Sequence, residues 1–316
     1  MSIRKPRQPR ADAGVKLRLI RFQATDGVVL PGLLYEPARR SRDAAIFLHG
    51  NGDASVFYAG RTNILGEELT RRGIAWFAFN NRGALQVKRL QRTKGDESER
   101  VLGGTAYELI RDCVHDIDGA ISMLRKEGYE RFHLVGHSTG ANKICVYNAL
   151  KPRNRATRYV LLGPGDDTGL YYAAAGPERF RRALERCREE VDRGRGEKLV
   201  PRWVSPYLMS WASMYDTINP DGDYNVFPFL EVTRGPRLSR KTPFLEYRTI
   251  RKPTLVVFGE NDEFCYGDVE GCMEAMRKYA PVPRKFTFRI LSDTDHGFHG
   301  SEPELARSIA RFIRSR

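Results

Sequence analysis

Hydrophobic residues along this chain fall into short continuous runs separated by stretches with helical spacing. Near the N-terminus, Leu17–Phe22 and Val28–Tyr35 flank Asp26-Gly27, a turn typical of an antiparallel β-hairpin. Six further apolar runs are typical of buried strands: Ala44–Leu48, Ile74–Phe79, Phe132–Val135, Tyr159–Leu162, Thr254–Phe258 and Phe286–Leu291. The pattern predicts an α/β protein with an eight-stranded, mostly parallel sheet and helices on both faces.

The stretches between these runs have the spacing of amphipathic helices. One apolar face is formed by residues three and four apart: Ile110, Val114, Ile117, Ile121 and Leu124. Gly128 follows this face, and glycine commonly ends a helix. Near the C-terminus, Ser301 and Glu304 form a capping-box pattern ahead of an apolar face that contains Leu305 and Ile309. We therefore expect a final helix there.

The regular alternation stops between Pro164 and Thr249. This stretch holds a helix-like segment, Glu178–Arg193, and then Pro, Trp and Tyr in irregular order. An irregular stretch of this length in a compact domain usually has a function. We therefore expect a flexible basic tail at 1–14, an α/β core domain at 15–164 and 249–316, and a cap or lid insertion after the sixth strand at 165–248.

Aromatic residues in this insertion are spaced by four: Trp203, Tyr207, Trp211 and Tyr215. The spacing predicts one aromatic face on a lid helix. Such a face either walls an apolar acyl or aryl pocket or packs the lid onto the core. Arginines of the preceding segment are interleaved with glutamates, which is typical of ion pairing on a helix surface.

The chain is strongly basic, with 53 Lys and Arg against 39 Asp and Glu, a formal net charge of +14. It has no RNP pattern, zinc-finger spacing or helix-turn-helix signal, so we expect a solvated basic surface and no nucleic-acid partner. Steering of an anionic substrate is the alternative. The longest apolar run, Ile74–Phe79, is far shorter than the ~18 residues of a membrane span. Five cysteines without a C-x-x-C pair favour a reducing cytoplasm.

The strongest chemical signal is the pentapeptide Gly136-His137-Ser138-Thr139-Gly140, a G-x-S-x-G pattern between a strand-like run and a helix-like run. A serine at a sharp strand-to-helix turn needs small neighbours, because the strand and the helix approach closely there. Its hydroxyl then lies at a helix N-terminus, where free N–H groups stabilise developing negative charge. The position predicts a nucleophilic serine.

An acid and a base follow the last two strand-like runs. Thr254–Phe258 leads into Gly259-Glu-Asn-Asp262, and Phe286–Leu291 leads to His296. A serine needs a base, and the base needs a carboxylate to fix its tautomer, in the chain order Ser, Asp, His for this turn. We therefore predict Ser138 as nucleophile, His296 as general base and Asp262 as orienting acid.

Residues of the same chemical type lie close to the predicted acid and base. Asp166 and Asp167 follow the sixth strand and are alternative carboxylates, and His299 is an alternative base. Glu260 and Glu263 are expected to be exposed loop charges. His137, beside the nucleophile, is expected to be structural.

The third strand-like run ends in His49-Gly50-Asn51-Gly52, which matches the position of an oxyanion-binding turn. We predict the backbone N–H groups of Asn51 and Thr139 as the two donors. Removal of one such donor typically costs about 2.7–4 kcal/mol of transition-state stabilisation. A glycine-rich turn without a role in the chemistry is the alternative.

Together, the H-G-N-G, G-H-S-T-G, G-E-N-D and D-H-G-F segments resemble the motifs of the α/β-hydrolase superfamily, from Val15 to the C-terminus. More loosely, four segments are similar to a branch that includes fungal siderophore-ester hydrolases: Phe79–Gly83, Asp112–Asp118, Gly136–Lys143 and Leu161–Asp167. Within this superfamily, the serine argues against dehalogenases and epoxide hydrolases, which use aspartate as nucleophile.

The resulting hypothesis is a serine hydrolase that cleaves a small-molecule carboxylic ester, lactone or thioester through an acyl-enzyme on Ser138. An amidase or peptidase, and a catalytically idle binding protein of the same fold, are the alternatives. Metal-ligand spacings, Walker motifs and G-x-G-x-x-G are absent from the sequence, so no cofactor is expected. The acyl group, the leaving group and the oligomeric state are not predicted.

Overall fold

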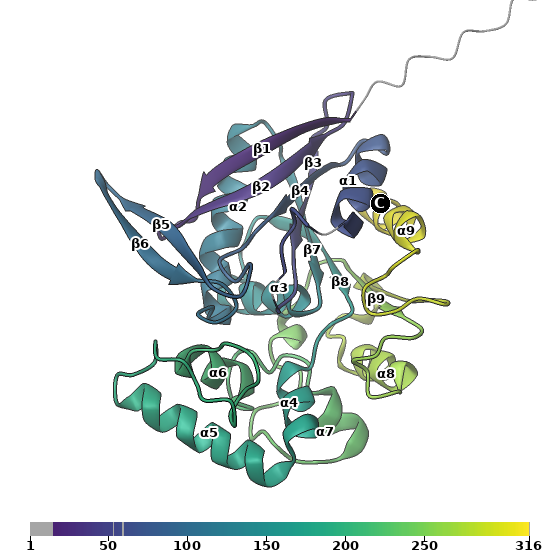
Figure 1. The fold of residues 1–316 in the computed structure, drawn as a ribbon. Helices are drawn as coiled ribbons and strands as arrows, with labels where there is room; N and C mark the ends of the chain where they lie inside the picture. The colour runs from purple at the N-terminus through teal and green to yellow at the C-terminus, as the bar shows by residue number, and fades with distance from the viewer. Residues whose placement is uncertain (1–14, 53, 59, 316) are drawn as a thin grey trace, which may run out of the picture.

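The structure, a computed structural model, describes residues 15–52, 54–58 and 60–315; the expected tail at 1–14 lies outside the described residues. Its centre is an eight-stranded sheet in the order β1-β2-β4-β3-β7-β8-β9-β10 (Figure 1). The strands are β1 (Lys16–Gln23), β2 (Val29–Glu36), β3 (Asp43–Leu48), β4 (Ala75–Phe79), β7 (Arg131–His137), β8 (Ala156–Leu162), β9 (Thr254–Gly259) and β10 (Phe286–Leu291). β2 is antiparallel to β1 and β4, and every other neighbouring pair is parallel. The predicted sheet is confirmed.

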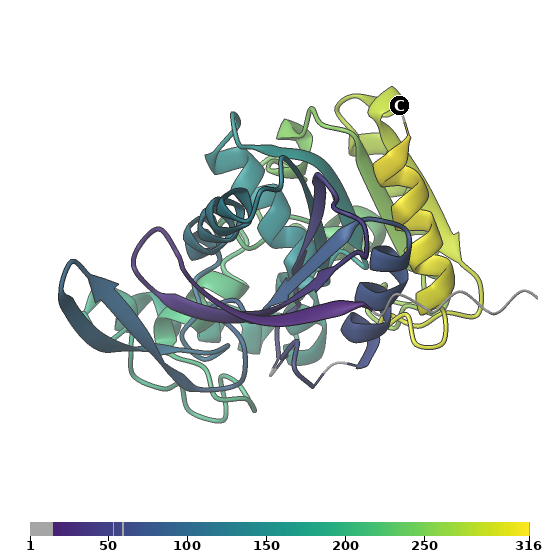
Figure 2. The same cartoon turned by 90° about the horizontal axis from the view of Figure 1, so that it is seen from above.

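Helices cover both faces of the sheet. On one face lie α1 (Gly60–Arg71) and α9 (Glu302–Arg314), which Figure 2 shows side by side. On the other lie α2 (Cys113–Lys126), α3 (Thr139–Leu150) and α8 (Val269–Tyr279). Successive strand residues point to opposite faces. Ile46 of β3 is therefore buried with α2, α3 and α8, whereas Phe47 is buried with α1 and α9.

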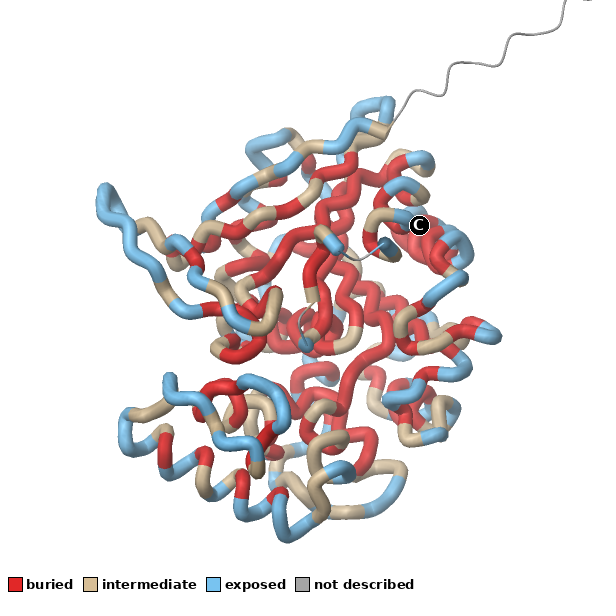
Figure 3. Tube along the Cα trace, in the orientation of Figure 1, coloured by how far each residue is buried: buried red, intermediate tan, exposed pale blue. Residues whose placement is uncertain are grey.

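The stretch between β8 and β9 folds as a mainly helical unit. It contains α4 (Asp167–Ala175), α5 (Pro177–Asp192), α6 (Trp211–Ile218) and α7 (Phe229–Arg234), and it ends in a 3-10 helix at Tyr247–Thr249. Two further 3-10 helices lie outside it, at Ile110–Asp112 and Pro283–Lys285. Figure 1 shows α4 to α7 together below the sheet, and Figure 3 shows buried segments between them and the strands. The unit has a hydrophobic cluster of its own, which includes Phe180 of α5 and Met214 of α6. The helix expected at Glu178–Arg193 is confirmed as α5.

The expected aromatic face on one lid helix is wrong. Trp203 lies in a turn and Tyr207 in a bend, and only Trp211 and Tyr215 share a helix, α6. Pro206 interrupts the segment because proline has no backbone N–H to donate. Ser210 then begins α6, since its side chain accepts a hydrogen bond from the N–H of Ser213 at 3.1 Å.

A two-stranded hairpin, β5 (Lys88–Lys94) and β6 (Glu97–Gly103), was not anticipated from the sequence. It projects from the body of the protein beside β1 and β2 (Figure 1). Its residues are mostly polar and many are exposed, so it lacks the apolar run that marks the strands of the main sheet. The remaining signal is the turn at Gly95, whose φ of 61° suits glycine.

A largely buried arginine fixes the loop that follows β4. Arg82 binds three carboxylates: Asp116 at 2.7 Å, Asp26 at 3.0 Å and Asp112 at 3.3 Å. These ion pairs raise the pKa of Arg82 against the lowering effect of burial. Two segments that carried the looser resemblance, Phe79–Gly83 and Asp112–Asp118, are therefore joined by one ionic cluster.

Two further observations concern the whole described chain. In residues 15–52, 54–58 and 60–315, no helix is long and apolar enough to cross a membrane. All five cysteines are buried with free thiols.

Candidate active site

Ser138 occupies a strained turn between β7 and α3. Its φ of 55° and ψ of −127° are unusual for a residue with a side chain. A Cβ atom on Gly136 would collide with the carbonyl oxygen of Gly140, and a Cβ atom on Gly140 would collide with that of Leu48. Both flanking glycines are therefore required by close backbone approach, as expected for a G-x-S-x-G turn.

Asp262 and His296 come together at the carboxyl ends of the neighbouring parallel strands β9 and β10. His296 Nδ1 lies 2.9 Å from both carboxylate oxygens of Asp262. Both residues are buried. A carboxylate only accepts hydrogen bonds when ionised, so the proton of the neutral imidazole lies on Nδ1. His296 Nε2 is then left as the basic nitrogen.

His137, which was expected to be structural, and Arg61, which the sequence did not single out, fix the position of His296. His137 Nε2 donates to the backbone carbonyl of His296 at 2.8 Å, and Arg61 donates to His137 Nδ1 at 3.3 Å. Burial and the nearby Arg61 charge lower the pKa of His137 well below its usual value. His137 is therefore a neutral imidazole with a structural role. Glu263 also contributes, because it accepts the backbone N–H of His296 at 3.1 Å.

The alternative carboxylates lie in two different environments. Asp166 accepts hydrogen bonds from the N–H groups of Gly169 (2.9 Å) and Leu230 (2.8 Å) and from Tyr266 (2.9 Å). Burial raises the pKa of Asp166 to about 6, and these bonds oppose the shift. Asp167 instead lines the same cavity as Ser138 and accepts a hydrogen bond from Thr139 Oγ1 at 3.2 Å.

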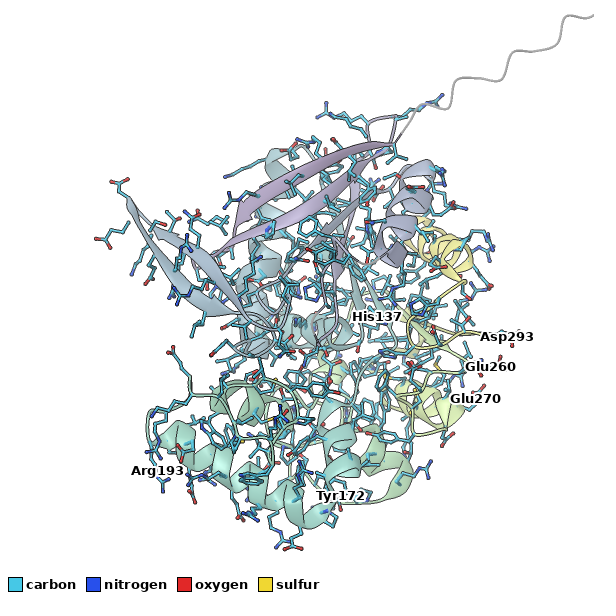
Figure 4. The ribbon with its side chains drawn as sticks, viewed as in Figure 1. His137, Tyr172, Arg193, Glu260, Glu270 and Asp293 are labelled. Atoms are coloured by element: carbon cyan, nitrogen blue, oxygen red, sulfur yellow. The ribbon has the colours of Figure 1, made fainter. Side chains whose placement is uncertain are left out.

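His299 and Glu260 point away from this centre. His299 is largely exposed and contacts Asp295 at 2.7 Å. Glu260 is exposed and accepts the backbone N–H of Asp293 at 2.9 Å. Figure 4 shows Glu260 and Asp293 at the outer edge of the molecule, whereas His137 lies inside it.

The turn after β3 packs directly against Ser138. A Cβ atom on Gly50 would lie 2.9 Å from Ser138 Cβ, so only glycine fits without a shift. His49 Nδ1 donates to the carbonyl of Gly50 at 2.7 Å, and its Nε2 accepts the N–H of Asn81 at 3.2 Å. Burial and the charge of Lys143 lower the pKa of His49 to about 3. His49 therefore holds this turn as a neutral imidazole.

The two residues predicted as oxyanion donors lie close to Ser138 in different ways: Thr139 follows it in the chain, and Asn51 lines the same cavity. The N–H of Thr139 belongs to the first turn of α3, where backbone N–H groups have no acceptor within the helix. The side chain of Asn51 does not face the nucleophile freely, because its Nδ2 donates to the hydroxyl of Tyr224 at 2.9 Å. Tyr224, which comes from the insertion, thereby steadies the turn that carries the Asn51 N–H.

One cavity of about 940 Å³ joins these elements. Ser138, His296 and the turn at Gly50 and Asn51 line one part of it. Apolar residues of the insertion line another part: Leu170, Ala174, Met209, Met214 and Ile218. Trp203, Trp211 and Tyr215 are absent from its described lining, so Tyr207 is the one member of the expected aromatic wall that reaches it.

Comparison with known proteins identifies the class that this fold and site define. The model of the alpha/beta hydrolase family matches residues 45–307. The chain therefore belongs to the α/β-hydrolase family, and the resemblance of its sequence motifs to that superfamily is confirmed. The looser similarity to the siderophore-ester branch stays a prediction.

Solved structures with the same fold include several esterases. An esterase from Pyrococcus furiosus is 15% identical over 96% of this chain and 92% of its own, with a TM-score of 0.55. Est1E from Butyrivibrio proteoclasticus, solved with ferulic acid bound, is 15% identical over 92% and 97%, with a TM-score of 0.58. The α/β hydrolase GrgF from a Penicillium species is 16% identical over 95% and 98%, with a TM-score of 0.63. No curated protein matches the sequence.

Proposed function

We propose that this protein is a serine hydrolase that cleaves a carboxylic ester through an acyl-enzyme intermediate. Ser138 Oγ attacks the ester carbonyl while His296 Nε2 takes its proton. The resulting oxyanion is bound by the N–H groups of Asn51 and Thr139. His296 then protonates the departing alcohol, and a water molecule, activated by the same imidazole, releases the acid from Ser138.

The observation that carries the proposal is the pair formed by Asp262 and His296. Nδ1 of the imidazole is held by a buried carboxylate at 2.9 Å, and the ring lines the same cavity as the strained Ser138. Asp262 stabilises the imidazolium that forms when His296 takes the serine proton. Each of the three residues follows a different parallel strand, so the sheet itself sets their relative positions.

An ester is the substrate class best supported by the surroundings of Ser138. Two of the fold neighbours are described as an esterase and a carboxylesterase. The cavity wall contributed by the insertion is apolar, as Leu170, Met214 and Ile218 illustrate. We therefore assign residues 165–248 the role of a cap that covers the site and receives the acyl group, a role typical of long insertions over active sites.

A fluorophosphonate probe tests the proposal, because it labels only an activated serine. We expect labelling of the wild type, loss of labelling in Ser138→Ala, and retention in Ser205→Ala. Ser205 lines the same cavity and accepts the N–H of Tyr207 at 3.1 Å, so it is a matched control serine. Hydrolysis of 4-nitrophenyl butyrate should follow the labelling.

An unlabelled wild type that also fails to hydrolyse 4-nitrophenyl esters would refute the proposal and favour a binding protein of the same fold. Labelling and turnover that persist in purified Ser138→Ala would refute Ser138 as the nucleophile. Cleavage of a 4-nitroanilide in preference to the matching ester would move the activity to the amidase class.

A further inference from the structure

A carboxylate in the catalytic cavity has no part in the proposed mechanism. Asp167 begins α4 and lines the cavity together with Ser138 and His296. A point 3.3 Å from Asp167 Oδ2, where a Cβ atom on Gly165 would lie, is 3.7 Å from both Ser138 Oγ and the Thr139 nitrogen. These distances place Asp167 Oδ2 within about 7 Å of the nucleophile and of a predicted oxyanion donor.

The cationic side chains that line the cavity, Arg61 and Arg179, and Lys143, whose charge acts on Asp167, have partners of their own. Arg61 donates to the carbonyl of Gly297 and to His137. Lys143 lies 2.6 Å from Glu108 in a buried ion pair. Arg179 uses its Nε to donate to the carbonyl of Trp203 at 2.7 Å. Throughout residues 15–52, 54–58 and 60–315, no basic side chain forms an ion pair with Asp167.

The nearby Lys143 and His296 offset the charge of Asp167 only in part, so this carboxylate still opposes the oxyanion that forms next to it. The oxyanion of the tetrahedral intermediate develops near the Thr139 N–H, and a second negative charge nearby disfavours it. Burial already raises the pKa of Asp167, which reports the same desolvation of its charge. A positive charge brought by the substrate would compensate both effects.

We infer that the acyl group of the substrate carries a protonated amine on the first or second carbon from the scissile carbonyl, and that Asp167 binds this ammonium. The inference rests on the proposed esterase function and names its substrate class: aminoacyl esters. Covalent bonds of about 1.5 Å place such a nitrogen about 3–5 Å from Ser138 Oγ. A charge-assisted hydrogen bond of about 2.8 Å then reaches a carboxylate at the distance found here.

The contacts of Asp167 fit this task. Thr139 Oγ1 donates to Oδ2, and the backbone N–H of Asp167 also bonds the carboxylate; a carboxylate has about four acceptor positions, so further ones are left for a ligand. The preceding Asp166 is fixed by three hydrogen bonds from Gly169, Leu230 and Tyr266, so the start of α4 is held rigidly. Beyond Asp167, Leu170 lines the cavity and suits an apolar remainder of the acyl group.

Three benzyl esters provide the test, because they differ in one group on the same carbon: L-alanine (ammonium), isobutyrate (methyl) and L-lactate (hydroxyl). The kcat/KM of each is measured with wild type, Asp167→Asn and the control Asp192→Asn, which removes an exposed carboxylate at the end of α5. The intrinsic reactivity of each ester cancels when the ratio of kcat/KM between two esters is compared across variants.

We expect the kcat/KM for the alanine ester, divided by that for the isobutyrate ester, to fall at least tenfold in Asp167→Asn. The same ratio should stay constant in Asp192→Asn. The kcat/KM for the isobutyrate ester should rise in Asp167→Asn, because its methyl group no longer lies against a charged carboxylate. If Asp167→Asn does not fold, Asp167→Ser takes its place, and fluorophosphonate labelling shows whether Ser138 remains activated.

A ratio that is the same in wild type and Asp167→Asn would overturn the inference while the esterase function stands. An equal loss of kcat/KM for the lactate and alanine esters in Asp167→Asn would also overturn it. Asp167 would then bind a neutral hydroxyl donor as well as it binds an ammonium. A wild type that hydrolyses none of the esters and resists the probe would instead refute the proposed function itself.

Discussion

Replacement of Asp262 by asparagine should disable the base while it leaves the fold in place. Asp262 Oδ1 accepts the backbone N–H of Phe264 at 3.0 Å, which favours the asparagine oxygen at this position. The amide NH2 then takes the place of Oδ2, 2.9 Å from His296 Nδ1. An NH2 group can only donate there, so the imidazole proton moves to Nε2 and the base is lost.

The expected loss in kcat follows from this change of tautomer. A carboxylate-to-amide replacement that sets the wrong tautomer lowers kcat by about 10⁴, which corresponds to about 5.4 kcal/mol at 1.36 kcal/mol per factor of ten. The unfolding midpoint should change little, because asparagine keeps the volume and the hydrogen bond to Phe264.

The assay compares kcat for 4-nitrophenyl butyrate in Asp262→Asn and Asp167→Asn. Both carboxylates are close to the site, but only Asp262 bonds the imidazole. Asp262→Asn should therefore be far more impaired. If Asp167→Asn proved the more damaging change, the orienting acid would be the residue after β8, and the assignment of Asp262 would be refuted.

Three further predictions address other parts of the structure. Ser138→Ala and His296→Ala should each lower kcat by about 10⁶, and the double variant should be no worse, because members of a triad act as a unit; additive losses would contradict this. Tyr224→Phe removes the acceptor of Asn51 Nδ2 and should lower kcat several-fold with little change in KM, as steady-state kinetics would show. Burial raises the pKa of Asp216 to about 7, above its ordinary value, so this group favours folding at low pH and loses that contribution as pH rises towards 7. Asp216→Asn should therefore raise the Tm more at pH 8 than at pH 5. An equal change in Tm at both pH values would contradict this contribution of Asp216.

The sequence predicted those parts of the site that are set by the sheet. Ser138, Asp262 and His296 each follow an apolar run, and the carboxyl ends of parallel strands meet at one edge of a sheet. The geometry places Asp262 and His296 in contact and brings Ser138 into the same cavity. Local patterns were enough because strand order and direction fix where these loops lie.

The supporting contacts had no such local signal. Arg61 reaches His137 across 76 positions of the chain, and Tyr224 reaches Asn51 across 173. Tyr224 lies in an irregular part of the insertion, where neither helical nor alternating spacing identifies a face. A residue's partner at that separation depends on tertiary packing, which periodicity does not encode.

The sheet and the insertion contribute different parts of the site, so substitutions in each should have different effects. The sheet carries Ser138, Asp262 and His296, whereas the insertion carries Asp167 and the apolar wall around Leu170. Asp166 couples the two, because it accepts the N–H of Leu230 from α7 and the hydroxyl of Tyr266 from the loop after β9. Substitutions within the apolar wall should therefore alter which ester is preferred while fluorophosphonate labelling of Ser138 persists. Loss of the Asp166 contacts, in contrast, should loosen α4 and weaken discrimination between substrates before it affects the activation of the serine.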